Sequence, residues 1–317
     1  MIKKRLPLLI GCILLPLIGL AKANSESRFK MWYDKPADEF IESLVMGNGS
    51  MGAIIYGGVQ KELINLNEST LWSGEPVKST IVPDVAKTTL AAIRKALDEG
   101  NYREADRLQY NLQGRFSQVY MPMAGLHIEF KGDSVATNYR RELDLSRAIT
   151  SVRYNIGRTE YNRTYFVSHP DNVVAVEFKA KGEGVINGEV ALDSKLHYTT
   201  SAADGVLAAE GYAPYYISFR TKAIAWDENR GIHFMVVVKP VEVDGTVECR
   251  DAKLVLKDCK RVVLLVASAT SFNGYDKDPV KEGRDYKSIA RKRLACGGFS
   301  PSGSLFSNFS SVVFNSI

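Results

Sequence analysis

A glycine-rich stretch near the front of the chain has the residue types and spacing of a phosphate-binding turn. In GNGSMG, Gly47, Gly49 and Gly52 match the pattern G-x-G-x-x-G, whose backbone N–H groups bind a pyrophosphate when a helix follows the turn. The residues that do follow, 53–59, read AIIYGGV. This β-branched and aromatic run is typical of a strand, and the glycines inside it disfavour a helix. The stretch therefore indicates a tight turn between strands rather than a nucleotide site, with Asn48 expected in a left-handed position.

Amide, carboxylate and indole side chains follow a short distance downstream. Asn67, Glu68 and Trp72 could form a surface on which a ring stacks against a sugar, or on which a second domain docks. The sequence favours the alternative, a tryptophan in the core of a sandwich with Asn67 and Glu68 holding a turn. Glu68 and Glu75 could also be read as an acid–base pair, which needs a raised pKa and a fixed separation. Nothing in the sequence indicates either, so no catalytic residue is assigned.

The histidines do not form a metal-binding pattern. His127 lies in an alternating apolar–polar stretch, and His169 precedes Pro170 in a turn. Both are therefore expected to be structural, with a ligand role for His127 as the alternative. No CxxC or HExxH motif occurs, so no metal and no cofactor is predicted.

The cysteines do not indicate a disulfide framework. If Cys12 leaves with a cleaved leader, Cys249, Cys259 and Cys296 remain, and an odd number cannot pair completely. Free buried thiols are expected, and a Cys249–Cys259 bond across a hairpin is the alternative.

The N-terminus has the pattern of a secretory signal peptide over residues 1–23. Lys3, Lys4 and Arg5 precede an apolar run over 6–20, and AKA at 21–23 is a small-residue cleavage site. Export to the periplasm or the extracellular space is expected, with lipid anchoring at Cys12 as the alternative. No later apolar run is long enough to span a membrane. The net charge of +5 is spread over 317 residues, so no nucleic-acid partner is predicted.

The hydrophobic pattern predicts a mainly β fold with two short helices inserted near the front. Apolar residues recur at helical spacing over 84–97 and 102–112, and a glycine follows each stretch. The period then changes to two, and turn residues such as Asp204-Gly205 and Asp244-Gly245 separate the stretches. Many short strands without intervening helices predict a large antiparallel β-sandwich. The expected strands are 126–130, 151–156, 165–167, 173–178, 188–192, 215–219, 232–238, 252–256 and 262–266.

Several separated blocks of the sequence closely resemble one known family. MGNGSMGA at 46–53, INLNESTLWSG at 64–74, YRRELDL at 139–145, FVSHPD at 166–171 and ATSFNGYD at 269–276 are similar, in this order, to the N-terminal domain of glycoside hydrolase family 95, the α-L-fucosidases. The resemblance covers about residues 28–294. It implies a β-sandwich of the supersandwich type, in agreement with the periodicity.

The resemblance also implies an activity and a domain arrangement. The family hydrolyses terminal α-L-fucosyl linkages of glycans by an inverting mechanism, and its catalytic residues lie in an (α/α)6 barrel that a helical linker joins to the sandwich. The expected domains are a signal peptide at 1–23, the sandwich at 28–275, the start of the linker at 276–293 and an atypical tail at 294–317. The chain is therefore expected to be truncated before the barrel and to lack the family's catalytic residues. Asn67, Glu68 and Trp72 would face substrate or the barrel.

The tail has an unusual composition, and a second function remains open. Residues 294–317 contain no Asp, Glu, Lys or Arg, which departs from the family and suggests a disrupted reading frame. The alternative to a fucosidase-derived domain is a non-catalytic carbohydrate-binding or structural β-sandwich module.

Overall fold

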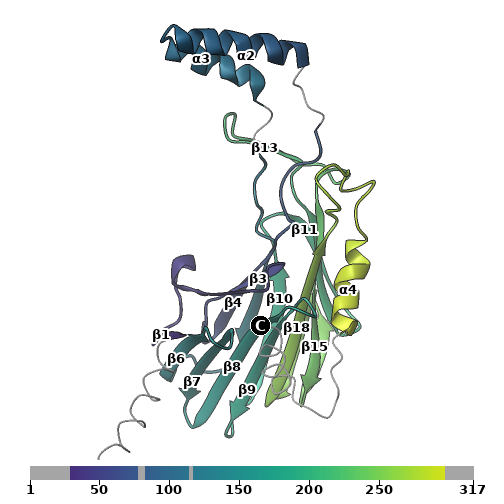
Figure 1. Cartoon of the computed structure of the whole chain (residues 1–317). Coiled ribbons are helices and arrows are strands. Elements are labelled where there is room, and N and C mark those ends of the chain that lie inside the picture. The colour runs from purple at the N-terminus through teal and green to yellow at the C-terminus, as the bar shows by residue number, and fades with distance from the viewer. Residues whose placement is uncertain (1–28, 78–82, 114–116, 297–317) are drawn as a thin grey trace, which may run out of the picture.

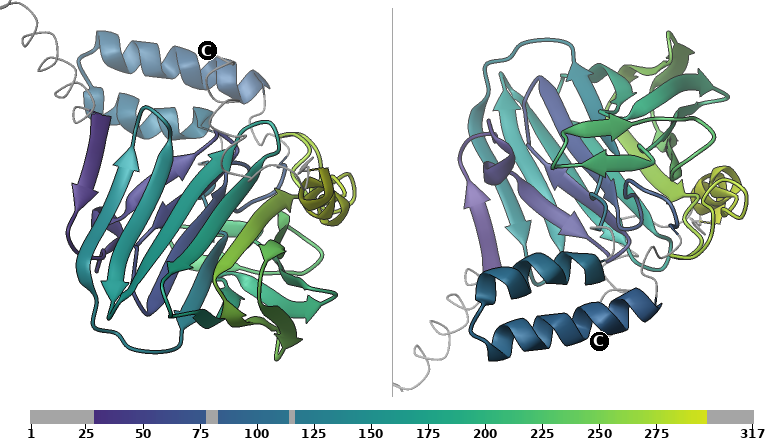
Figure 2. Two further views of the ribbon diagram at one scale, coloured as in Figure 1. Left: turned by 90° about the horizontal axis from the view of Figure 1, so that it is seen from below. Right: turned by 90° about the horizontal axis from the view of Figure 1, so that it is seen from above.

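The chain is described by a computed structural model that covers residues 29–77, 83–113 and 117–296. Within these ranges two large antiparallel sheets pack face to face, and a pair of helices stands at one end (Figures 1 and 2). The predicted mainly β antiparallel sandwich is confirmed. The predicted signal peptide and residues 297–317 of the predicted tail lie outside the described residues.

The larger sheet has nine strands, and β18 lies near its middle. Half of the neighbouring pairs in the sheet are consecutive in sequence, and tight turns join them, as at Asp204-Gly205, where both residues have positive φ. In spatial order the strands are β1 (Lys30–Tyr33), β6 (Thr137–Asp144), β7 (Ile149–Ile156), β8 (Thr159–Ser168), β9 (Val173–Lys181), β18 (Arg261–Thr270), β15 (His233–Val243), β12 (Val206–Tyr212) and β11 (His197–Ala203).

The second sheet has seven strands, and a small hairpin of β13 (Tyr216–Ser218) and β14 (Ala223–Ala225) is separate from both sheets. A single turn of 3-10 helix, η2 (Phe40–Glu42), precedes its first strand along the chain. In spatial order the strands are β16 (Thr246–Arg250), β17 (Lys253–Cys259), β10 (Ile186–Asp193), β5 (Ala124–Phe130), β4 (Lys61–Glu68), β3 (Met51–Ile55) and β2 (Leu44–Gly47).

The core lies between the two sheets because successive side chains of each strand point to opposite faces. In β4 the burial alternates residue by residue: Glu62, Ile64, Leu66 and Glu68 point inward and are buried. In β18 residues of both faces are buried from Val262 to Thr270, since helix α4 (Tyr286–Cys296) packs on β18 and β15 from outside.

The front helices form where the sequence predicted them. Helix α2 (Pro83–Asp98) is followed by α3 (Tyr102–Gln109) and by a 3-10 turn, η3 (Tyr110–Leu112). Gly100 has a φ of +71° after α2, and the Asn101 side chain accepts a hydrogen bond from the Glu104 N–H at 3.2 Å, which caps α3. Helix α4 was not predicted from the sequence.

The helical pair α2–α3 is an excursion from the second sheet between β4 and β5. The two ends of this excursion are joined by backbone hydrogen bonds, Ser73 N–H to Val119 O at 2.8 Å and Met121 N–H to Leu71 O at 3.0 Å. The helices themselves pack mainly on each other and on η3, and Figure 1 shows them standing clear of the sheets.

Candidate functional site

The glycine-rich stretch forms the hairpin turn between β2 and β3, so the interpretation as a turn is confirmed. The prediction for Asn48 is wrong, because Gly49 takes the left-handed position with a φ of +88°. The Asn48 carboxamide oxygen instead accepts hydrogen bonds from the N–H groups of Ser50 at 2.9 Å and Met51 at 2.8 Å. This bonding holds the turn with Asn48 in ordinary backbone geometry.

The same asparagine ties the two sheets together. Its Nδ2 donates to the Ser168 carbonyl oxygen at 2.8 Å and to Asn172 Oδ1 at 2.9 Å. Ser168 ends β8 and Asn172 precedes β9, so the turn of one sheet rests on a turn of the other. The glycine-rich stretch is therefore a contact between the sheets at this end of the sandwich.

Gly47, Gly52 and Asn67 lie side by side on the outer face of the second sheet. Gly47 pairs with Gly52, and Gly52 pairs with Asn67. A Cβ atom added at Gly52 would lie 3.7 Å from the Met46 carbonyl oxygen and 3.9 Å from the Asn67 Cβ, which is ordinary contact. Asn67 is half-buried and makes no side-chain hydrogen bond to any residue that the structure describes. This patch presents bare backbone and an open amide to whatever lies outside it.

Glu68 points to the opposite face and is buried. Its Oε2 accepts hydrogen bonds from the Thr70 N–H at 2.7 Å and from the Thr70 hydroxyl at 2.5 Å. The interpretation that Glu68 holds a turn is therefore confirmed, whereas Asn67 does not take part. Alternation along β4 separates the two predicted site residues, because neighbours in a strand face opposite sides.

Trp72 lies on the surface, so the favoured interpretation as a core residue is wrong. Its side chain is 42% exposed, and the core position is taken by Leu71, which is fully buried. The indole N–H donates to the Ser69 carbonyl oxygen at 3.1 Å, and the ring meets the Tyr120 ring edge-on at 5.5 Å. Tyr120 is also exposed, so two aromatic rings are open to solvent where the α2–α3 excursion leaves the sandwich.

Glu75 does not form an acid–base pair with Glu68. Its carboxylate accepts hydrogen bonds from Nε of Arg230, at 3.0 Å, and from Nη2 of the same side chain. The Arg230 guanidinium also lies 3.5 Å from the centre of the Tyr215 ring. Glu75 therefore joins the base of the excursion to the loop between β14 and β15, which is a structural role.

The histidines are placed at the surface of the sandwich. His127 Nε2 lies 3.0 Å from Asp193 Oδ1 on the outer face of the second sheet. His169 is exposed in the turn that follows β8. In the part of the chain that the structure describes, no group of three or more His, Cys, Asp or Glu side chains could hold a metal ion.

Cys249 and Cys259 are free thiols in different environments. Cys259 is buried, as expected, but Cys249 is exposed. Cys249 pairs in register with Leu254 of β17, and Cys259 pairs with Ile186 of β10. The alternative of a Cys249–Cys259 disulfide across the hairpin is therefore wrong.

Sequence reasoning missed a charged cluster buried between the sheets. Glu62 of β4 accepts hydrogen bonds from Arg163 at 2.9 Å, from the Tyr165 hydroxyl at 2.8 Å and from the Gly57 N–H at 2.8 Å. Arg163 of β8 also donates to the carbonyl oxygens of Gly58 and Val59. Burial raises the pKa of the Glu62 carboxyl, and its hydrogen-bond donors oppose this effect. The sequence signal was a charged residue at an inward position of an alternating strand.

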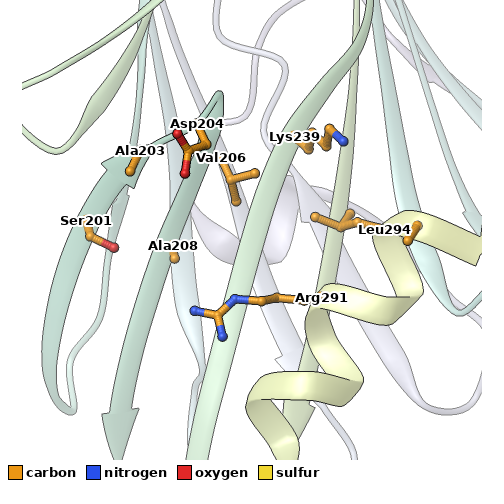
Figure 3. A pocket seen from close by; sticks show the side chains of 9 residues that line it. Ser201, Ala203, Asp204, Val206, Ala208, Lys239, Arg291 and Leu294 are labelled. Atoms are coloured by element: carbon orange, nitrogen blue, oxygen red, sulfur yellow. The ribbon is translucent and has the colours of Figure 1, made fainter.

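A shallow groove of about 310 Å³ lies beside α4 on the outer face of the larger sheet (Figure 3). Small apolar side chains form its floor. Lys239 and Arg291 line it and make no ion pair with another residue that the structure describes. The other lining residues are Ser201, Ala203, Asp204, Val206, Ala208, Leu294 and Ala295.

The geometry of the predicted site suits recognition more than bond cleavage. Glu68 is buried and hydrogen-bonded, and Glu75 is paired with Arg230. Asn67, Trp72 and Tyr120 remain available at one end of the sandwich. Glycoside hydrolysis needs an acid and a second carboxylate facing one substrate, and the predicted residues do not provide this arrangement.

A family model identifies the described sandwich as the N-terminal domain of a glycoside hydrolase. Residues 31–275 match the family described as "Glycosyl hydrolase family 65, N-terminal domain", and the chain belongs to that family. A solved structure described as a putative kojibiose phosphorylase from human microbiome superposes with a TM-score of 0.51 over 90% of this chain and 37% of that chain. The sequence identity to that structure is 11%, so the likeness concerns the fold alone.

The similar curated proteins are named as fucosidases. Alpha-L-fucosidase 2 of Arabidopsis thaliana is 32% identical over 259 residues, which is 77% of this chain and 30% of the relative. Probable alpha-fucosidase A of Aspergillus niger is 34% identical over 153 residues, which is 45% of this chain and 19% of the relative. The resemblance to the N-terminal domain of the α-L-fucosidase family is thereby confirmed. The chain spans less than a third of the length of these relatives.

Proposed function

We propose that this chain is the β-sandwich component of an exported α-L-fucosidase. In this proposal the sandwich supports the hydrolysis of terminal α-L-fucosyl linkages, with inversion, by an (α/α)6 barrel against which it packs. The names of the relatives support the reaction class. The positive n-region, apolar run and AKA motif at the N-terminus support export.

One observation supports a non-catalytic role for the sandwich within the fucosidase. The acidic residues nearest the family motif are fully engaged in structural contacts, Glu68 with Thr70 and Glu75 with Arg230. The side chains of Asn67 and Trp72, which are near them in the sequence, can contact a glycan or the barrel, but they cannot serve as a catalytic acid or base. No helix among the described residues is long and apolar enough to cross a membrane.

An activity assay on the purified chain tests this proposal. We expect no release of fucose from 2′-fucosyllactose by the chain alone, measured by chromatography against an active α-L-fucosidase as the positive control. Release of fucose that persists after repeated purification would contradict the supporting role, because it would require catalytic residues within this chain.

Direct glycan binding is a second candidate function, and the exposed Trp72 ring favours it. A tryptophan ring that is 42% exposed and meets a second exposed ring, that of Tyr120, is suited to stack on the apolar face of a sugar. Calorimetric titration with fucosylated oligosaccharides tests this function. Binding that disappears in Trp72→Ala but persists in Tyr110→Ala, which removes an exposed ring elsewhere, would establish it. Absence of binding to any fucosylated oligosaccharide would reject it.

A further inference from the structure

The α2–α3 pair carries an apolar stripe that the described chain covers only in part, since two of its residues, Ala86 and Ile93, are half-buried. Ala86, Leu90, Ile93 and Leu97 are spaced by four, three and four residues along α2, which is the seam pattern of packed helices. Leu90 is 42% exposed and Leu97 is 46% exposed. We call these four residues the α2 stripe.

The partner of α2 within the chain uses a different face. Thr89 and Ala96 are buried, and each lies one residue before a leucine of the α2 stripe. These are the positions that face α3, the main packing partner of α2. The α2 stripe therefore borders the α2–α3 contact with Ala86 and Ile93, and its two leucines remain open for a second helical neighbour.

The position of the helices shows that the sandwich is not this neighbour. The pair stands clear of both sheets (Figure 1), and its packing is mainly internal. The leucine side chains of a surface helix normally cover a core. Here they extend from the sandwich at the end where Trp72 and Tyr120 are also exposed.

We infer that the α2–α3 pair is an arm that holds the larger domain of the α-L-fucosidase, with the α2 stripe packed on that domain's helices. This inference rests on the proposed function. The matched region is 30% of the Arabidopsis relative, and the similar solved structure is also a longer chain. In those proteins the sandwich has more polypeptide beside it, and a barrel of helices offers the grooves that the seam spacing fits.

The length of the relatives, and not charge, favours the larger domain over a second copy of this chain as the occupant. Lys87 and Arg94 each follow a stripe residue and lie on the side away from α3. Lys87 pairs with Asp84 at 4.0 Å, and Asp98 lies four residues after Arg94. The charges beside the α2 stripe are therefore mixed, and the occupant is a helical surface that is apolar opposite the two leucines of the stripe.

A binding experiment with matched variants tests the arm. The probe is the part of Arabidopsis alpha-L-fucosidase 2 that follows its matched region, produced separately and shown to be competent by binding its own N-terminal region. Sedimentation velocity measures its affinity for the full 317-residue chain. We expect Leu90→Glu/Leu97→Glu to lose at least about tenfold in affinity, since two apolar anchors become charged. Thr88→Glu/Ala91→Glu, with the same added charge on the opposite side of α2, should stay within about twofold of the unsubstituted chain.

The outcomes separate this inference from the proposed function. If the unsubstituted chain binds the probe and the stripe variant binds equally well, the arm is refuted and the packing of the sandwich on the larger domain stands. If the unsubstituted chain does not bind, both fail. Self-association that is lost only in the stripe variant would make a second copy the occupant and overturn the inference. Circular dichroism, with Leu90→Gln/Leu97→Gln as a neutral second variant, checks that the helices remain folded.

Discussion

At the residue scale, Gly52 and Gly57 have different structural requirements. Gly57 has a φ of +75°, and a Cβ atom there would lie 2.6 Å from the Tyr139 hydroxyl and 2.8 Å from Arg141 Cδ. At Gly52 the backbone is ordinary and the nearest heavy atom would be at 3.7 Å. The interior of this chain therefore requires glycine at position 57 but not at 52.

This difference gives a paired prediction. Gly57→Ala should destabilise the chain by about 2–5 kcal/mol, the sum of the left-handed backbone cost and overpacking. Gly52→Ala should change the free energy of unfolding by less than about 1 kcal/mol. Urea denaturation followed by circular dichroism measures both. A large loss of stability in Gly52→Ala would show that position 52 is constrained from within the chain, which contradicts its role as an open patch.

The buried ion pair also supports a prediction at this scale. Arg163→Met leaves the buried Glu62 carboxylate without its cation and two backbone carbonyls without the donor that Arg163 supplies. The free energy of unfolding should therefore fall by about 3–5 kcal/mol. The control is Lys61→Met, which removes an ion-pair partner of the exposed Glu129. It should lower the free energy of unfolding by less than about 1 kcal/mol. Adding Glu62→Gln to Arg163→Met should recover part of the loss. If the double variant is no more stable than Arg163→Met, an uncompensated charge is not the cause.

At the scale of elements, the helical pair should be less stable than the sheets. Its amides are protected mainly by contacts between α2, α3 and η3, whereas β18 is covered on both faces. Native-state hydrogen exchange should therefore give a lower opening free energy for α2 and α3 than for β18. Asn101→Ala removes the cap of α3 and should lower its opening free energy by about 1 kcal/mol, with β18 unchanged. Equal protection of helices and sheets would show that the pair packs on the sandwich.

Elements with a clear period were predictable from the sequence. The two front helices agree with the structure within a few residues, because helical spacing is local information. The turns at Asp204 and Asp244 were also found, since Asp-Gly pairs favour such turns. Helix α4 was missed. Among the residues of α4 whose burial is described, 286–295, only Ala290 and Leu294 are buried, and the helix packs on β15 and β18.

The candidate site was less predictable because its geometry depends on distant contacts. Glu62 meets Arg163, 101 residues away, and no local pattern joins them. The exposure of Trp72 depends on which of Leu71 and Trp72 faces the core, and the type of residue alone favoured the wrong one. The role of Asn48 likewise depends on Ser168 and Asn172 of the other sheet.

At the scale of the whole molecule, the sandwich and the helical arm are separable parts. The strands that flank the arm are already joined through Ser73 and Val119. The arm therefore resembles a long insertion in a hairpin connection, and shortening such a connection lowers the entropy cost of closing it. The core residues of both sheets lie outside the arm, so the sandwich does not need the arm in order to fold.

Removal of the arm tests this modularity. Replacing residues 78–115 with a short Gly-Ser linker keeps Glu75 and its partner Arg230, and it keeps Gln118, whose Oε1 accepts from the Ile217 N–H at 2.9 Å. The shortened chain should lose helical circular dichroism and retain its β signal. Its Tm should change by less than about 4 °C, which for a domain of this size is about 1 kcal/mol.

The comparison variant is Leu126→Ala in the core, which should lower the free energy of unfolding by about 2–5 kcal/mol. If the shortened chain unfolds as readily as the core variant, the arm is part of the folding unit. If it stays folded but no longer binds the larger fucosidase domain, the arm acts in association and not in stability.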